Sequence, residues 1–189
     1  MRVGYDGLIN EAKDKLSKLS MRDPEYNDKR DFYEAMIIMH EAAKTYIERY
    51  ASLCEEKAKE EQDEKRKEEL LMMAENCHQI AGGTPQTFWQ AMQLFNIATT
   101  LIQVESNGHS ISYGRMDQWL YPYYEKDIKN GTITKEFALE LIEVEYVKMN
   151  NPTKLKDKGS MAVRNGRGLE EKVLRSVELT VKEMMQQMI

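Results

Sequence analysis

The segment ESNGHSISYGRMDQ, residues 105–118, gathers the side chains best placed to bind a small polar molecule. His109 and Ser110 are adjacent there, follow the turn-forming pair Asn107-Gly108, and precede an Arg-x-Asp sequence. An imidazole and a hydroxyl can each donate and accept a hydrogen bond, so the pair can hold a hydroxylated ligand. The competing interpretation is a loop histidine whose hydrogen bonds are satisfied within the protein, and residue spacing alone favours it.

The two cysteines show no pattern for metal binding or nucleophilic catalysis. Cys54 precedes two glutamates and Cys77 precedes His78, but a metal site needs further ligands at matched spacing, which the sequence lacks. A nucleophilic thiol needs a nearby base or an electropositive setting. Both cysteines lie on apolar helical stripes, so we expect them in the core. His40 is expected at a helix surface or at the edge of the core, and we assign no catalytic residue and no metal ligand.

Helical patterns flank the loop on both sides and predict a mainly α fold with at most a short strand, around residues 161–164. Apolar residues recur at spacings of three and four over residues 8–19, 32–54 and 70–81. The charged run EEKAKEEQDEKRKEE between the second and third of these is expected to be a solvated helix surface and a turn. The segment FWQAMQLFNIATTLIQVE is apolar on most sides, which predicts a helix buried on several faces.

Local signals indicate where these helices start and stop. Gly82-Gly83 is expected to end one helix in a left-handed turn. Thr87 with Gln90 predicts a capping box for the next helix.

Beyond the loop, a short helix is expected from Trp119, with Pro122 acceptable only in its first turn. Asn130-Gly131 predicts a turn, and Thr134 is expected to cap a helix that runs to about residue 149. We expect one helical region over residues 1–150, a polar linker over 151–168 and an amphipathic helix over 169–189.

Composition and charge exclude several classes of function. The 189 residues carry a net charge of −5, with acidic and basic side chains interspersed, whereas a nucleic-acid-binding protein shows a basic face. No apolar run reaches the ~18 residues of a membrane helix, and no apolar secretory segment follows Arg2. Two cysteines in a chain of this size indicate reduced thiols. We therefore expect a cytoplasmic protein that binds neither nucleic acid nor membrane.

Three motifs, QTFWQA, GHSISYGRMDQ and YPYYEKDI, resemble the glycyl radical enzymes, which include pyruvate formate-lyase and the glycerol-type dehydratases. The preceding KRDFYEAMIIMHEAAKTYIERYA and GLINEAKDKL resemble the same family's upstream helices, so the resemblance covers about residues 7–150. It implies a helical slice of that family's α/β barrel, with the loop at 105–118 facing the substrate. His109 and Ser110 match a His-Ser pair that contacts substrate hydroxyls in the dehydratase branch.

The resemblance also implies radical chemistry that this chain does not complete. In the family, a stored glycyl radical oxidises a cysteine to a thiyl radical, which abstracts hydrogen from the substrate. A separate activating enzyme installs the radical with S-adenosylmethionine and an iron–sulfur cluster. The family's cysteine turn has no counterpart here, because no Gly-Cys dipeptide occurs. The start MRVGYDG resembles the family's radical loop but lacks one residue, so we expect Gly4 to form a tight turn.

The leading interpretation is therefore a truncated glycyl radical enzyme-like protein that is inactive alone and holds no cofactor itself. The parent activity is a radical lyase or dehydratase reaction on a small hydroxylated substrate, or formate acetyltransferase chemistry. The partners implied are the missing half of the barrel, an activating enzyme or a second copy of the chain. The rival interpretation is a helical module that catalyses nothing and forms an oligomer or binds a partner.

Overall fold

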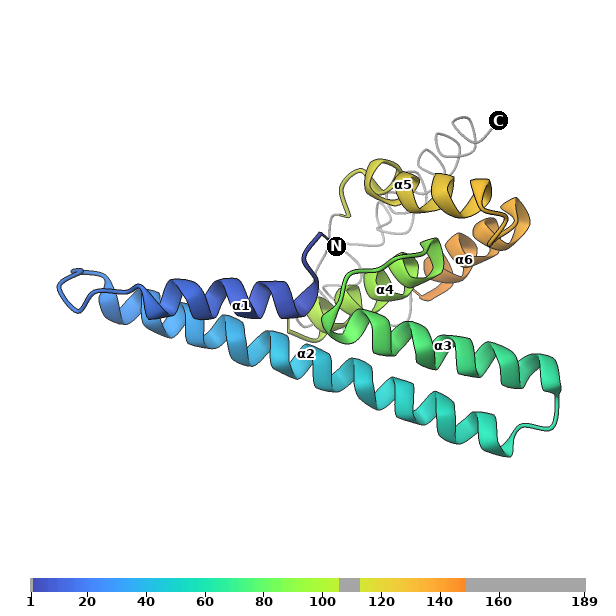
Figure 1. Ribbon diagram of the computed structural model, residues 1–189, viewed down its shortest axis with the longest axis horizontal. Helices are drawn as coiled ribbons and strands as arrows, with labels where there is room; N and C mark the ends of the chain where they lie inside the picture. Colours follow the sequence, from blue (N-terminus) through green and yellow to red (C-terminus); the bar gives the residue numbers. More distant parts are fainter. Residues whose placement is uncertain (1, 106–112, 149–189) are drawn as a thin grey trace, which may run out of the picture. The chain divides into compact units, whose positions relative to one another are not determined.

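The computed structural model describes residues 2–105 and 113–148, and within these ranges the chain forms six α-helices and no strand (Figure 1). This confirms the mainly α fold; the strand expected at residues 161–164 lies outside the described residues. The helices are α1 (Gly4–Ser17), α2 (Tyr26–Glu60), α3 (Glu64–Gly82), α4 (Phe88–Glu105), α5 (Met116–Lys129) and α6 (Lys135–Lys148). None of the helices described is long and apolar enough to cross a membrane.

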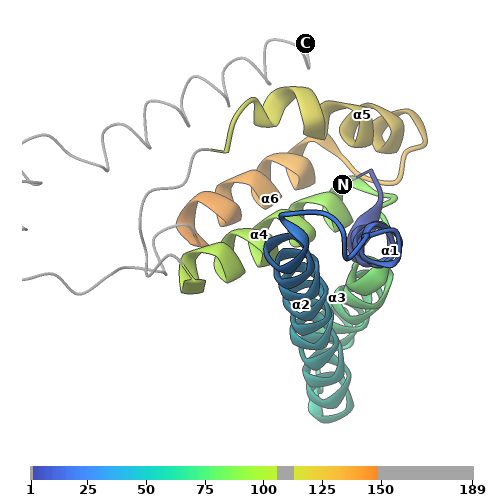
Figure 2. The ribbon, with the colours of Figure 1, turned by 90° about the vertical axis from the view of Figure 1, so that its left-hand side faces the viewer.

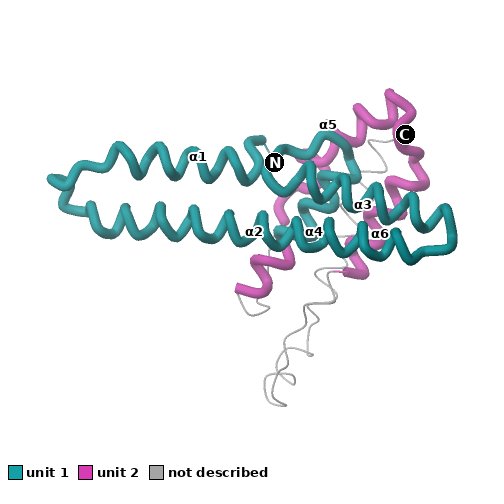
Figure 3. Tube along the Cα trace, turned by 60° about the horizontal axis from the view of Figure 1, so that its bottom comes forward, with its two compact units in different colours: residues 1–98 teal, residues 99–189 magenta. Residues whose placement is uncertain are grey.

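The chain divides into two compact units, residues 1–98 and residues 99–189 (Figure 3). The first part of α4 belongs to unit 1 and its last part to unit 2. The linker and the helix expected after residue 150 lie outside the described residues, so that division of the chain stays a prediction.

Unit 1 is organised around α2, the longest helix. α1 lies antiparallel beside the N-terminal half of α2, and α3 returns antiparallel beside its C-terminal half (Figures 1 and 2). Small side chains dominate the buried side of α2, which lets the neighbouring helices approach closely. These buried residues are His40, Ala43, Ile47, Ala51, Cys54 and Ala58.

The charged run between α2 and α3 forms helix ends and a turn, as predicted. α2 ends at Glu60 and α3 begins at Glu64. Asp63 is the N-cap of α3, and its carboxylate accepts a hydrogen bond of 3.0 Å from the backbone N–H of Lys65. This bond satisfies one of the backbone donors left without a partner at a helix start.

The start of α1 abuts the end of α3 in unit 1. Gly4 has a φ of +63°, and a Cβ placed on it would lie 2.5 Å from the carbonyl oxygens of Gly82 and Gly83. Asp6 lies at the same junction, where its carboxylate forms an ion pair with Lys44 of α2. Gly4 is the first residue of α1 rather than part of a turn before it. Glycine is required there by both its φ and its contacts.

α3 ends at Gly82 as predicted, but the left-handed turn expected there is wrong. Gly83 has φ −82° and ψ −176°, which is extended backbone. A Cβ on Gly82 would collide with the carboxylate of Asp6. Close packing against the start of α1, rather than a left-handed conformation, accounts for glycine at Gly82.

The capping of α4 is confirmed in part. The Thr87 hydroxyl accepts a hydrogen bond of 3.2 Å from the backbone N–H of Gln90, whereas the Gln90 amide oxygen accepts one of 2.7 Å from Gln86, one residue before the cap. The first three turns of α4 bury apolar residues as expected, namely Phe88, Ala91, Met92, Leu94, Phe95 and Ile97. Its last turn is not, since Ile102 is 51% exposed and Val104 76% exposed.

Unit 2 contains the described part of α4 after Ala98, together with α5 and α6. α5 begins at Met116 rather than near Trp119, so Pro122 lies inside the helix instead of in its first turn. The prediction for Pro122 was wrong, and α5 lacks the backbone hydrogen bond that a residue with an N–H would make there. Met116, Leu120 and Tyr124 of α5 and Ala138 and Ile142 of α6 are buried.

The turn between α5 and α6 follows the prediction. Gly131 has a φ of +69°, Thr132 N–H donates to the Asp127 carbonyl at 2.9 Å, and Gly131 N–H donates to the Ile128 carbonyl at 3.1 Å. These paired bonds form a Schellman motif. Thr134 then caps α6, because its hydroxyl accepts a 3.1 Å hydrogen bond from the backbone N–H of Phe137.

Candidate functional site

His109 and Ser110, the candidate substrate-binding pair, lie in residues 106–112, outside the described residues. Their contact with a substrate therefore stays a prediction. The structure describes what flanks them in unit 2: the end of α4 before the segment, and Tyr113 to Asp117 after it. Glu105 and Tyr113 are the described residues on either side of the segment.

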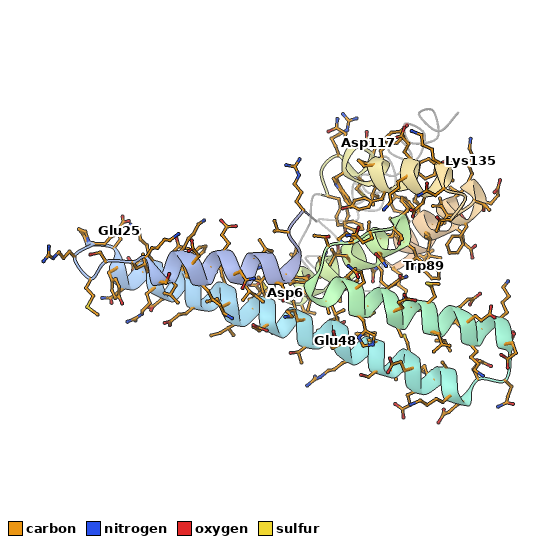
Figure 4. All side chains as sticks on the ribbon, in the orientation of Figure 1. Asp6, Glu25, Glu48, Trp89, Asp117 and Lys135 are labelled. Carbon is orange, nitrogen blue, oxygen red and sulfur yellow. The ribbon has the colours of Figure 1, made fainter. Side chains whose placement is uncertain are left out.

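The Arg-x-Asp sequence that follows the segment forms a local ion pair. Arg115 Nε lies 3.0 Å from one Asp117 carboxylate oxygen, and Arg115 Nη2 lies 2.6 Å from the other. The Asp117 side chain is only 2% exposed, whereas that of Arg115 is 60% exposed. Asp117 is labelled in Figure 4. The hydrogen bond from Arg115 holds the pKa of Asp117 below its usual range. The carboxylate stays charged and fixes the first turn of α5.

Tyr113 anchors the backbone directly after the segment. Its carbonyl accepts a hydrogen bond of 3.5 Å from the indole N–H of Trp119. The Tyr113 side chain is half-buried, and burial, followed by the negative charge of Glu145, raises the pKa of its phenol. The phenol therefore stays protonated at neutral pH and can donate a hydrogen bond at the edge of the segment.

Unit 2 also holds the buried carboxylates of the described chain. Asp117, Asp127 and Glu145 are each 4% exposed or less, and among the described residues no other acidic side chain is buried. The charge of Glu145 also raises the pKa of Tyr146, after the larger effect of burial. Sequence analysis missed Asp127 and Glu145, because an isolated acid on a helix gives no signal of burial. The Arg-x-Asp spacing was the available signal for Asp117.

Both cysteines are core residues, as predicted. Cys54 and Cys77 are buried free thiols. Burial raises the pKa of Cys77 to about 11, against the smaller lowering effect of a hydrogen bond from the Gln93 amide, whose nitrogen lies 2.8 Å from Sγ. Burial also raises the pKa of Cys54. A nucleophilic thiol needs the opposite shift.

His40 is more buried than expected, at 7% exposure. Its Nδ1 lies 2.6 Å from the Met36 carbonyl and donates to it, and its ring packs against Tyr5 with centroids 5.8 Å apart. The prediction of a surface or core-edge residue failed because α1 covers this part of α2. Over residues 2–105 and 113–148, no cluster of His, Cys, Asp and Glu could hold a metal ion.

His78 of α3 lies between two glutamates of α2, an arrangement that sequence analysis missed. Nδ1 is 2.8 Å from the Glu48 carboxylate and Nε2 is 3.1 Å from the Glu55 carboxylate (Glu48 is labelled in Figure 4). Hydrogen bonds to Glu55 and then Glu48 raise the His78 pKa, because both favour the imidazolium. Its two nitrogens face opposite ways, so the cluster joins two helices rather than chelating a ligand.

Gly4, Cys54 and Cys77 do not have the setting of the family's glycyl and thiyl radical carriers. The α-carbon of Gly4 is covered by the carbonyls of Gly82 and Gly83, and Gly4 itself is buried. The sulfurs of Cys54 and Cys77 are buried among helices. These residues pack within unit 1.

Comparison with known proteins gives the site its context. The chain matches the family model described as pyruvate formate lyase-like over residues 1–169, which extends past the point near Asn150 where the resemblance was expected to fade. It is 74% identical over 168 residues to (2S)-3-sulfopropanediol dehydratase of Klebsiella oxytoca, covering 89% of this chain and 20% of that protein.

Solved structures show the same fold. The glycerol-bound B12-independent glycerol dehydratase of Clostridium butyricum is 44% identical with a TM-score of 0.79, over 84% of this chain and 20% of that one. A glycyl radical enzyme of Archaeoglobus fulgidus is 36% identical with a TM-score of 0.74, over 79% of this chain and 19% of that one. The chain thus spans about a fifth of the length of the relatives it matches.

Proposed function

The chain belongs to the pyruvate formate lyase-like family, and we propose that it supplies the part of a radical dehydratase in which His109 and Ser110 contact a small hydroxylated substrate. The observation that carries this proposal is the 74% identity to (2S)-3-sulfopropanediol dehydratase over 168 residues. We assign the same class of substrate, a short diol bearing an anionic sulfonate.

The chemistry of the pair suits a diol. An imidazole and a serine hydroxyl can each donate and accept, so together they can match two neighbouring hydroxyl groups without leaving a polar atom unpaired. The pair would also discriminate between substrates, because a site built to bind two hydroxyl groups rejects an analogue that lacks one of them.

The described residues that follow the segment support a role in positioning it. The Arg115–Asp117 ion pair and the Trp119–Tyr113 hydrogen bond fix the backbone a few residues after Ser110. A fixed backbone reduces the entropy lost when the substrate is oriented. We propose that Tyr113 to Asp117 hold the substrate-facing segment in place and do not contact the reacting atoms.

In this family a glycyl radical supplies hydrogen-atom abstraction through a cysteine thiyl radical, and a separate radical-SAM activating enzyme installs it. Because Gly4, Cys54 and Cys77 do not fit these carriers, we propose that residues 1–189 bind no cofactor. The carriers come from the four fifths of the family's fold outside this chain, whether in the same polypeptide or in another. We place the assembly in the cytoplasm.

A chimaera tests the substrate-binding role. Residues 1–169 of this chain, which the family model covers, replace the matching segment of the Klebsiella dehydratase, and the activated chimaera is assayed on (2S)-3-sulfopropanediol. We expect activity, and we expect His109→Ala and Ser110→Ala each to lower kcat/KM by about 10²–10³-fold, as for lost hydrogen bonds to a reacting substrate.

Lys129→Ala is the matched control, since its ion pair with Glu125 at 3.0 Å is exposed and contributes little. A correctly folded chimaera that keeps its activity in both variants would exclude His109 and Ser110 from substrate binding. A second measurement addresses the radical carriers. After incubation of residues 1–189 with an activating enzyme and S-adenosylmethionine, a glycyl doublet in the electron paramagnetic resonance spectrum would contradict the proposal that the chain carries no radical.

A further inference from the structure

Cys54 of α2 and Cys77 of α3 are the two cysteines of the chain, and both are buried free thiols in unit 1. They are 7% and 2% exposed, respectively. The proposed function uses neither of them. Because α2 and α3 pack side by side and antiparallel (Figure 1), the register of the two helices decides whether the thiols face each other.

The contacts of His78 fix that register. Its Nδ1 lies 2.8 Å from the Glu48 carboxylate and its Nε2 lies 3.1 Å from the Glu55 carboxylate. Because one side chain reaches both glutamates, His78 lies between them along the axis of α2. The antiparallel direction of α3 then places Cys77 about one residue further toward the C-terminus of α2. Cys54 is only about 2 Å along the axis from that level, at 1.5 Å rise per residue.

Small side chains surround both thiols and let the two helices approach closely. Each cysteine is flanked along the buried side of its helix by two alanines, one before and one after. These alanines are Ala51 and Ala58 on α2 and Ala74 and Ala81 on α3, and each is 2% exposed or less. Helices in contact lie about 8–10 Å apart, with small residues at the shorter end.

That spacing suits a disulfide. The Cα atoms of a helix lie about 2.3 Å from its axis, so facing Cα atoms in such a pair are about 4–6 Å apart. A disulfide spans about 4.4–6.8 Å between Cα atoms. The register and the small side chains therefore bring Cys54 and Cys77 within bonding reach.

The surroundings of Cys77 agree with this placement. Burial is the main cause that raises the pKa of Cys77 to about 11, and Cys54 acts in the same direction, as a neighbouring thiol does. The Gln93 amide nitrogen of α4 lies 2.8 Å from Cys77 Sγ and also donates to the Met73 carbonyl at 3.1 Å. The amide thus keeps a strong acceptor if the sulfur turns toward Cys54.

We propose that Cys54 and Cys77 form a redox-sensitive pair, which a peroxide converts to a disulfide that links α2 to α3. The peroxide oxidises one thiol to a sulfenic acid and is itself reduced, hydrogen peroxide giving water. The second thiol attacks the sulfenic sulfur, the sulfur–sulfur bond forms, and the hydroxyl leaves with a proton as water. Two thiols and one hydrogen peroxide thus give one disulfide and two water molecules.

The setting of the pair makes this oxidation slow but stabilising. Burial raises the pKa of both thiols, and the thiolate is the reactive form, so the native chain reacts slowly. The bond closes a loop over residues 54–77, which includes the turn between α2 and α3. Closing this loop restricts the unfolded chain while the native packing is retained. This inference concerns unit 1 and does not depend on substrate binding.

Peptide mapping of the native 189-residue chain after treatment with hydrogen peroxide tests the pair. We expect a peptide linked through Cys54 and Cys77 in the non-reduced digest, and we expect dithiothreitol to separate it. Mapping distinguishes this product from oxidised methionine, and dilute protein keeps the reaction within one chain.

The matched control moves one thiol along α2. The double variant Cys54→Ser with Ala58→Cys keeps two thiols on the same buried sides of α2 and α3, but places one about 6 Å further from its partner along the axis. It should form the disulfide at least about tenfold more slowly, since the distance limits of the bond are exceeded. Circular dichroism confirms that the variant keeps its helices.

A second measurement does not depend on access of the oxidant to the core. The chain is oxidised in urea at low concentration and is then refolded by dilution. We expect the oxidised chain to regain the circular dichroism of the reduced chain and to unfold at a urea concentration higher by about 1 M.

Three results would overturn the proposal. The first is a native chain that gives no Cys54–Cys77 peptide at any peroxide concentration that leaves the helices intact. The second is a shifted control that forms its disulfide as fast as the wild type. The third is an oxidised chain that fails to refold, or that unfolds at a lower urea concentration than the reduced chain, because the bond would then not fit the native packing.

Discussion

Gly4 and Gly82 meet where α1 begins and α3 ends, and a Cβ on Gly4 would lie 2.5 Å from the Gly82 carbonyl oxygen. This contact joins the two helices that lie end to end along α2. It also explains two glycine motifs, at the N-terminus and at Gly82-Gly83, without radical chemistry or a left-handed helix end.

Gly4→Ala should destabilise unit 1 by roughly 2–4 kcal/mol, from the combined cost of a positive φ and a collision with backbone. Gly114→Ala separates the two costs, because Gly114 has a φ of +64° and no atom of the described residues lies within 4 Å of its Cβ position. That variant should lose only about 1 kcal/mol. Urea denaturation measures both, and equal losses would show that the helix junction contributes nothing.

Thiol labelling reports on the core of unit 1. Cys54 and Cys77 should react with iodoacetamide at pH 8 only as the protein unfolds, because both are buried and burial raises both pKa values, that of Cys77 to about 11. Mass spectrometry of the native and urea-denatured chain gives the rates. Rapid labelling of either thiol in the native protein would contradict the assignment of both cysteines to packing.

The sequence predicted what depends on local signals. The Thr87 and Thr134 caps and the Asn130-Gly131 turn are set by residues within a few positions of each other, and each was located correctly. The left-handed end at Gly82-Gly83 was wrong; Gly82 instead packs closely against Asp6, a residue far away in the sequence that no local pattern marks.

The polar contacts described above also fall into two groups, those marked by a local sequence pattern and those that depend on tertiary packing. The Arg115–Asp117 pair is visible in the sequence because its members are two positions apart. The contact of His78 with Glu48 joins residues 30 positions apart on different helices, and no local pattern marks it. The burial of Glu145 likewise depends on tertiary packing, which overrides its polar character.

Asp117→Asn should destabilise unit 2 by about 1.5–3 kcal/mol at pH 7, since it removes a charged acceptor from a buried pair of hydrogen bonds. Asp14→Asn is the control, because the Asp14–Lys18 ion pair is exposed on α1 and should cost only a few tenths of a kcal/mol. The Asp117 pKa is lowered in the folded chain, so its contribution is present above the unfolded pKa of about 3.9. It should disappear as pH falls through the folded pKa, and a loss that stays constant down to acid pH would contradict the ion pair.

The His78 contacts with Glu48 and Glu55 should make the packing of α2 against α3 depend on pH. The folded pKa of His78 is raised, so its contribution is complete below the unfolded value of about 6.5 and is lost as pH rises through the folded value. The side chain is 47% exposed, so screening limits the effect to about 0.5–1 kcal/mol. We therefore expect the difference in unfolding free energy between the wild type and His78→Gln to be largest near pH 6 and to shrink in alkaline buffer.

Nuclear magnetic resonance of the imidazole protons measures the His78 pKa directly. Glu55→Gln should lower that pKa more than Glu48→Gln, because the hydrogen bond to Glu55 is the larger cause of the shift. The double variant should titrate near the value of a free histidine. If His78 in the wild type already titrates at or below that value, the two carboxylates do not hold the imidazolium, and the pH dependence predicted for unit 1 is absent.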